Sequence, residues 1–294
     1  MRIFGGLLGL ALALFLWAVT ATVLGVAVFG GPVAALLTFL GSPGLGVWLA
    51  IALFALFMAT LFAYVLGAVA TVVLMAAPAT AAPLPTDPLE SFAGGFLTGL
   101  TAGVNFGLWA LVPFGLPIGI VVGTICFLVV FPPVSRSLGF QSVLGWSSWI
   151  MPYSWLATGV GLLLFVINLP LALGSLGPGA VRLDVLTGTI ETTGGIVGIT
   201  GFVGGGFNLG NFSFLSPGPG VGLAIQTPFG TTGLSAHETG HTLSVPGFGG
   251  MFHWINAVDE NVPPLRRFRA AYGELIAESH FPAPLPIRHV RIWS

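Results

Sequence analysis

The uneven spread of charge along the chain constrains its fold more than any other feature. Only four charged residues lie among the first 173 of its 294 residues: Arg2, Asp87, Glu90 and Arg136. A typical soluble domain has about 25% charged residues, whereas this chain has 6%. This composition excludes a wholly soluble enzyme and a nucleic-acid-binding protein, since the net charge is −1 and the eight arginines form no basic patch. The single cysteine, Cys126, excludes a disulfide framework and a cysteine-based metal cluster.

Long apolar segments in residues 1–173 predict transmembrane helices, because about 20 apolar residues are enough to cross a bilayer. We expect an all-α membrane domain of about five spans, with four or six as alternatives: Gly5–Phe29, Gly46–Ala76, Ser91–Val112, Leu116–Phe131 and Trp155–Leu173. Tryptophans near the last span, such as Trp146 and Trp155, are typical of an aromatic belt at the headgroup level. No charged residue lies in the middle of a span, which argues against an ion-coupled transporter.

Residues 174–294 hold the other charged residues and all five histidines, so we expect a second domain there that meets water. Its first part is rich in glycine and contains short runs of β-type residues. These runs predict a small antiparallel meander of four strands: Ala180–Leu186, Gly195–Thr200, Asn208–Leu215 and Val221–Thr227. A low-complexity glycine linker is the alternative interpretation.

The residues that carry chemistry form an H-E-x-x-H motif, made of His237, Glu238 and His241. Residues i and i+4 share one face of a helix, so both histidines can bind one Zn²⁺. Glu238 then lies beside the metal, where it can act as a general base toward water. We expect a helix over Ser235–Leu243 with Ser235 as its N-cap. The alternative is a surface helix that happens to carry two histidines.

A mononuclear zinc site needs a third protein ligand, and two glutamates compete for this role. Glu274 and Glu278 share one face of an expected helix over Phe268–His280. This favours Glu274 as the ligand and Glu278 as the residue that orients a ligand histidine. Glu260 is the alternative ligand, because it follows His241 at a spacing similar to that in aminopeptidase-type gluzincins.

Two further histidines lie near these candidates. His280 is a candidate donor to the transition state or simply a polar helix end. We expect His253 to pack or to form a hydrogen bond beside Trp254.

The sequence His-Glu-Thr-Gly-His-Thr-Leu resembles the short H-E-x-G-H domains of bacterial membrane and toxin-associated proteins. Glu274-Leu-Ile-Ala-Glu278 is similar to the E-x-x-A-[DN] element of those domains and of minigluzincins. In gluzincins the first glutamate of that element is the third zinc ligand, so the resemblance implies this role for Glu274. Glu278 departs from the usual aspartate or asparagine. The resemblance covers about residues 220–281 and implies a small α+β gluzincin-like domain, in a multi-pass protein of the bacterial inner membrane.

These features predict a membrane-anchored zinc metallopeptidase that hydrolyses peptide bonds with water activated by Zn²⁺ and with Glu238 as general base. Its expected partners are the lipid bilayer and a peptide or protein substrate. One alternative is a non-catalytic membrane scaffold with a structural zinc site. Another is a site-2-type intramembrane protease, although the Asp-Gly dipeptide of that class is absent from the chain.

Overall fold

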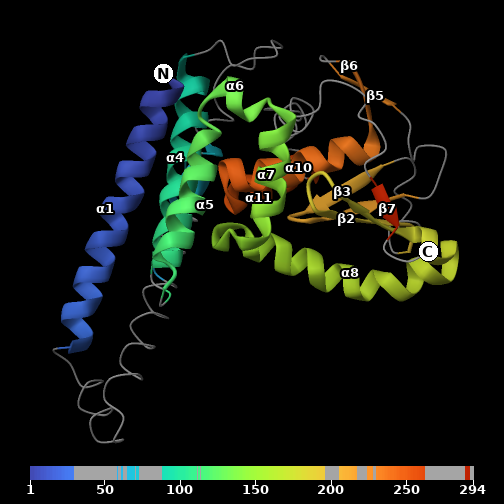
Figure 1. Ribbon diagram of the computed structural model, residues 1–294, viewed down its shortest axis with the longest axis horizontal. Coiled ribbons are helices and arrows are strands. Elements are labelled where there is room, and N and C mark those ends of the chain that lie inside the picture. The colour runs from blue at the N-terminus through green and yellow to red at the C-terminus, as the bar shows by residue number, and fades with distance from the viewer. Residues whose placement is uncertain are drawn as a thin grey trace, which may run out of the picture.

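The computed structural model describes residues 1–29, 58, 61, 65–69, 71–72, 88–110, 112, 114–195, 205–216, 224–227, 230–261 and 289–291. Three apolar helices lie side by side on one flank of the molecule (Figure 1): α1 (Arg2–Phe29), α4 (Pro88–Ala110) and α5 (Leu116–Leu128). A Cβ atom on Gly99 would lie 1.9 Å from the carbonyl oxygen of Gly6. Glycine therefore permits the close approach of α1 and α4, as small residues do between membrane helices.

The expectation of about five membrane spans is wrong for the described part of the chain. There, two helical segments are long and apolar enough to cross a membrane: Arg2–Val19 and Pro152–Leu176. Helix α5 has 13 residues, or about 20 Å of helix, which is too short for a hydrocarbon core of about 30 Å. Helix α4 is longer, but buried polar residues such as Thr98 and Asn105 interrupt its apolar sequence. The expected span Gly46–Ala76 falls mostly outside the described residues.

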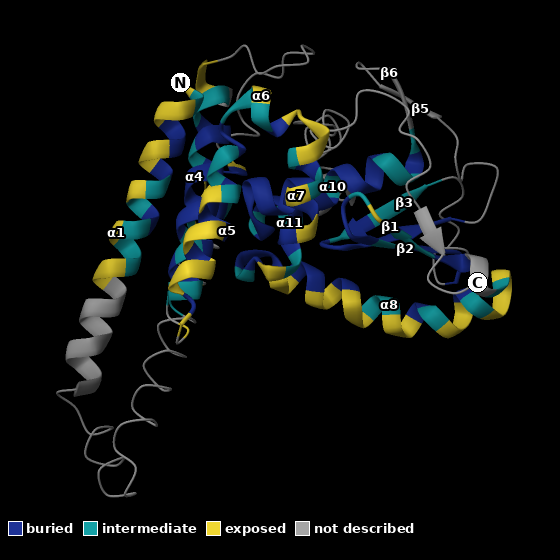
Figure 2. Cartoon of the chain, viewed as in Figure 1, coloured by how far each residue is buried: buried dark blue, intermediate teal, exposed yellow. Residues whose placement is uncertain are grey.

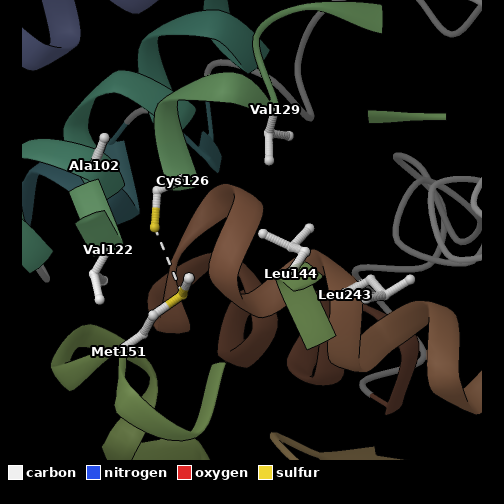
Figure 3. Packing of buried hydrophobic residues seen from close by; sticks show 7 residues of the cluster. All are labelled: Ala102, Val122, Cys126, Val129, Leu144, Met151 and Leu243. Atoms are coloured by element: carbon white, nitrogen blue, oxygen red, sulfur yellow. Dashed lines mark hydrogen bonds between the residues drawn. The ribbon is translucent and has the colours of Figure 1, made fainter. Parts of the chain in front are cut away.

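Several short helices and the long helix α8 link the three-helix group to the sheet, and α7 joins α5 in a hydrophobic core. The linking helices are α6 (Pro132–Ser135), α7 (Leu138–Ser147), η1 (Ser148–Ile150), η2 (Pro152–Ser154), α8 (Trp155–Leu176) and η3 (Gly177–Ala180). Figure 3 shows Val122 and Cys126 of α5 close to Leu144 of α7 and to Met151. Leu243, from the segment that carries the histidine motif, belongs to the same cluster. The apolar helices therefore pack directly against the element that bears the motif.

Five strands form one sheet in the order β3-β4-β2-β1-β7. They are β1 (Val181–Asp184), β2 (Thr189–Thr193), β3 (Gly206–Leu209), β4 (Phe212–Leu215) and β7 (His289–Arg291). Strands β2 and β4 pair in parallel, so the sheet is not a simple antiparallel meander. A second, two-stranded sheet consists of β5 (Ala224–Thr227) and β6 (Gly230–Gly233).

The strands agree in part with those expected from the sequence. β1 lies within the predicted run Ala180–Leu186, whereas β2 was not predicted. The predicted strand Asn208–Leu215 is divided by a turn at Gly210, which has a φ of 64°. The predicted run Gly195–Thr200 lies outside the described residues apart from Gly195.

Two helices cover the opposite faces of the five-stranded sheet (Figure 1): α8 on one face and α10 (Leu234–Phe248) on the other. On the α8 face, the ring of Phe212 lies 5.3 Å from that of Phe165 and 5.6 Å from that of Trp149, measured between centroids. The α10 face is polar and includes Glu191 and Asn208, both buried. Helix α11 (Gly250–Asn261) follows α10 after Gly249, whose φ is 91°. The sheet therefore separates an apolar layer from a polar one.

Candidate metal centre

Helix α10 carries the H-E-x-x-H motif and begins directly after β6, so the expected strand-to-helix context is confirmed. Gly233 occupies the N-cap position, and the expectation that Ser235 is the N-cap is wrong. Ser235 lies inside the first turn, where its hydroxyl donates to Oε1 of Glu191 on β2 at 2.5 Å. The buried carboxylate of Glu191 needs a hydrogen-bond donor, and the Ser235 hydroxyl supplies it instead of capping the helix.

Two more hydroxyls on α10 join it to the polar face of the sheet. Thr242 donates to the carbonyl oxygen of Gly210 at 2.8 Å and accepts from Nδ2 of Asn208 at 2.8 Å. Thr239 lies 3.4 Å from Oδ2 of Asp184, at the end of β1. With the bond from Ser235 to Glu191, three successive turns of α10 are bonded to the sheet. These bonds fix the rotation of the helix about its axis and thus the direction in which its histidines point.

The two histidines of the motif converge, as their helical spacing predicts. Nε2 of His237 lies 3.2 Å from Nε2 of His241. Their ring centroids are 4.8 Å apart, and the rings are almost perpendicular, at 87°. His237 is buried, whereas His241 is half-buried. The rings therefore point two imidazole nitrogens at one place.

Glu238 follows His237 in the chain and is 3% exposed. Its carboxylate approaches the edge strand β3 closely, because a Cβ atom on Gly206 would lie 2.8 Å from its Oε1 atom. The same Cβ would lie 2.9 Å from the carbonyl oxygen of Phe214. The absence of a side chain at Gly206 therefore leaves the space that the Glu238 carboxylate uses.

His253 of α11 lies at the same edge of the sheet and is buried. Its Nε2 atom lies 2.9 Å from the carbonyl oxygen of Asn208. A carbonyl only accepts, so this nitrogen carries the proton and donates. Burial, and then the positive charge of His241, lower the pKa of His253 to about 4. His253 is therefore neutral near pH 7 and anchors α11 to β3.

Most of the candidates for the third ligand lie outside the described residues. The backbone of Glu260 lies in α11, and its side chain lies outside the described residues. Glu274, Glu278 and His280 also lie outside them. Among the described residues, no three His, Cys, Asp or Glu side chains are placed to hold one metal ion together. The choice between Glu274 and Glu260 thus stays a prediction.

Sequence reasoning missed the residues that hold α10 in place. Asp184 is fully buried and accepts hydrogen bonds from the Leu186 amide at 3.0 Å and from the Thr187 hydroxyl at 2.8 Å. Glu191 and Asn208 are also buried on the face that meets α10. The sequence signal for these residues was the alternation of polar and apolar residues in the strands. Such alternation predicts a polar face, but it does not show whether that face meets water or is buried.

No protein-family model, curated protein or solved structure gives a significant match to this chain.

Proposed function

We propose that this chain is a membrane-anchored zinc metallopeptidase whose metal is held by His237 and His241, with Glu238 as the general base. The observation that carries the proposal is the distance of 3.2 Å between the Nε2 atoms of the two histidines. Two imidazole nitrogens that share a tetrahedral Zn²⁺, each at about 2.0–2.1 Å, lie about 3.3 Å apart. The two residues therefore fit a shared zinc ion.

The third ligand that we propose is Glu274, for which the E-x-x-A element is the support. The alternative at Glu260 has the aminopeptidase-like spacing as its support. A carboxylate as third ligand would leave a fourth position open, as in catalytic zinc sites. A structural zinc site, which the scaffold alternative requires, would instead recruit a fourth side chain such as His280.

Zinc held at this place would polarise the carbonyl of a peptide bond and lower the pKa of water. Glu238 performs the proton transfers: its carboxylate accepts a proton from the attacking water and then gives it to the departing amine. Its burial and its close approach to Gly206 restrict the position of this carboxylate. Restricted motion of the base favours catalysis, because little reorganisation is needed during the reaction.

The activity can be tested with the Glu238→Gln variant in detergent micelles, using a library of fluorogenic peptides. We expect this variant to keep its zinc and to lose hydrolysis by at least about 10²-fold, because an amide cannot accept the proton. Glu191→Gln is the matched control, since it removes another buried carboxylate next to α10. It should keep zinc and hydrolysis, because its amide oxygen still accepts the Ser235 hydroxyl. Normal hydrolysis by Glu238→Gln would rule out the proposed mechanism.

We also propose that α1 anchors the chain in a membrane, the bacterial inner membrane according to the resemblance. Its outer face carries exposed Phe4, Leu7 and Phe15, with 53–63% of each side chain accessible. The one charged residue of α1, Arg2, donates to the carbonyl oxygen of Val129 at 3.1 Å. Over residues 3–19 the helix thus offers lipid an uncharged surface.

A further inference from the structure

Helix α8 buries polar side chains along its inner face and exposes apolar side chains on its outer face, with Ser175 near its C-terminal end as an exposed polar residue. It contains no charged residue. Asn168 is fully buried and donates to the carbonyl oxygen of Gly194 at 3.3 Å, and Thr158 donates to Oδ1 of Asn211 at 3.0 Å. The outward positions include Leu163 and Val166, which are 62% and 57% exposed. This arrangement is the reverse of a helix at a protein–water surface.

The tryptophans next to α8 are oriented in the same way. Trp146 and Trp155 are each about half exposed, at 47% and 48%. The indole N–H of Trp146 donates to the carbonyl oxygen of Val185 at 3.1 Å, and that of Trp155 to the carbonyl oxygen of Trp149 at 3.0 Å. The only polar atom of each ring is thus paired with a carbonyl of the chain, and the rest of the ring offers hydrocarbon to its surroundings. An aqueous surface does not require this arrangement, whereas a lipid surface favours it.

The sheet covers α8 along most of its length. The buried residues of the helix run from Ala157 to Ala172, which corresponds to about 24 Å at 1.5 Å per residue. Figure 2 shows exposed residues along the side of α8 that faces away from the sheet. If α8 crossed a bilayer, the strands packed beside it would lie at the depth of the hydrocarbon. There, the unpaired backbone groups of the edge strands β3 and β7 would find no water to bind.

We propose that α8 lies along the membrane surface instead of crossing it, with its outer face in lipid hydrocarbon. The occupant of this face is lipid, because the exposed side chains from Trp155 to Leu171 are apolar and the neighbouring indoles have their N–H groups paired. Helix α10 lies on the opposite face of the sheet, so the pair His237 and His241 is on the side away from the lipid. This inference does not depend on the proposed peptidase activity.

The depth of three positions on one side of α8 tests the proposal. Leu156, Leu163 and Gly174 are exposed and lie within about 20° of one another around the helix axis, at 100° per residue. Each is replaced by cysteine, in the variants Leu156→Cys, Leu163→Cys and Gly174→Cys, and labelled with an environment-sensitive fluorophore. The labelled proteins are reconstituted into phosphatidylcholine–phosphatidylglycerol vesicles that contain lipids brominated at different acyl positions. The unsubstituted protein is the control, since its Cys126 is fully buried.

We expect all three labels to be quenched by brominated lipid and to report the same depth within about 4 Å. A helix that crosses the bilayer would place Leu163 deeper than Gly174 by roughly 10–16 Å, since these residues are 11 positions apart along the axis. That result would overturn the proposal. Quenching by aqueous iodide without quenching by brominated lipid would also overturn it, as would protection from both quenchers, which would indicate a protein partner on this face.

Discussion

The two faces of the five-stranded sheet use opposite chemistry to hold their helices. On the α8 side, Phe212 and Phe214 are buried against aromatic and aliphatic side chains. On the α10 side, Asp184 and Glu191 are buried against hydroxyl groups. Apolar contacts are non-directional and tolerate small shifts, whereas buried hydrogen bonds have defined partners and angles.

This difference explains why the histidine motif lies on the polar side. A metal centre needs ligand side chains held in one orientation, and hydrogen bonds supply that directional restraint. The apolar side needs only to exclude water and to present a surface to lipid. The polar side is also the more vulnerable one, because each broken bond leaves a buried group without its partner.

Acid should therefore weaken the polar side, through His253. The pKa of this histidine is about 4 in the folded protein against 6.5 without its environment, so the unfolded state binds the proton more readily. The sign follows: the free energy of unfolding should fall as the pH drops from about 6.5 to 4, by about 3 kcal/mol in total. Urea unfolding of the metal-free protein in micelles would measure this slope. His253→Gln keeps a donor for the Asn208 carbonyl and should lose that part of the slope; an unchanged slope would contradict the assignment.

The same substitution on the two faces should have opposite effects. Thr242→Val removes a hydroxyl that bonds to Gly210 and Asn208, and should lower the free energy of unfolding by about 1–3 kcal/mol. Thr192 lies on the α8 face, opposite Phe214 in the register, and its buried hydroxyl has no hydrogen-bond partner within the described residues. Thr192→Val should therefore be neutral or stabilising by up to about 1 kcal/mol. Equal losses in denaturant unfolding of both variants would show that the two faces do not differ as described.

The smallest expected effect concerns the space beside Glu238, the proposed general base. Gly206→Ala adds a methyl group 2.8 Å from Oε1 of Glu238 and 2.9 Å from the carbonyl oxygen of Phe214, so both the carboxylate and the pairing of β3 with β4 must shift. We expect hydrolysis to fall by about tenfold, equivalent to about 1.4 kcal/mol, with zinc content unchanged. Gly205→Ala is the matched control, because a Cβ atom there meets nothing within 4 Å. A similar loss in both variants would point to a general disturbance of β3 and not to displacement of Glu238.

The features that could be predicted from the sequence are those set by local periodicity. The apolar helices expected at Gly5–Phe29, Ser91–Val112 and Leu116–Phe131 and the helical pairing of His237 with His241 follow from local composition and spacing. The number of spans could not be predicted in this way. An apolar segment such as Leu116–Phe131 packs inside a protein as readily as in lipid, and composition does not distinguish the two environments.

Contacts between residues far apart in the chain also could not be predicted from the sequence. Ser235 was expected to cap α10, but its partner is Glu191, 44 positions away along the chain. The parallel pairing of β2 with β4 and the contact of His253 with Asn208 likewise depend on the tertiary fold. These contacts hold the candidate metal centre in place, and no local sequence pattern predicts them.

The most direct test of the account is the zinc content of the purified protein and of two variants, His237→Ala and His241→Ala, measured by atomic emission after dialysis against chelator-treated buffer. The account predicts about one Zn²⁺ per chain in the wild type and loss of the metal in both variants. His253→Ala is the control, because its Nε2 atom is committed to the Asn208 carbonyl, and it should keep the metal. Zinc that is undiminished in both variants, or absent from the wild type, would contradict the account. The distance of 3.2 Å would then mark a hydrogen bond between two imidazole rings.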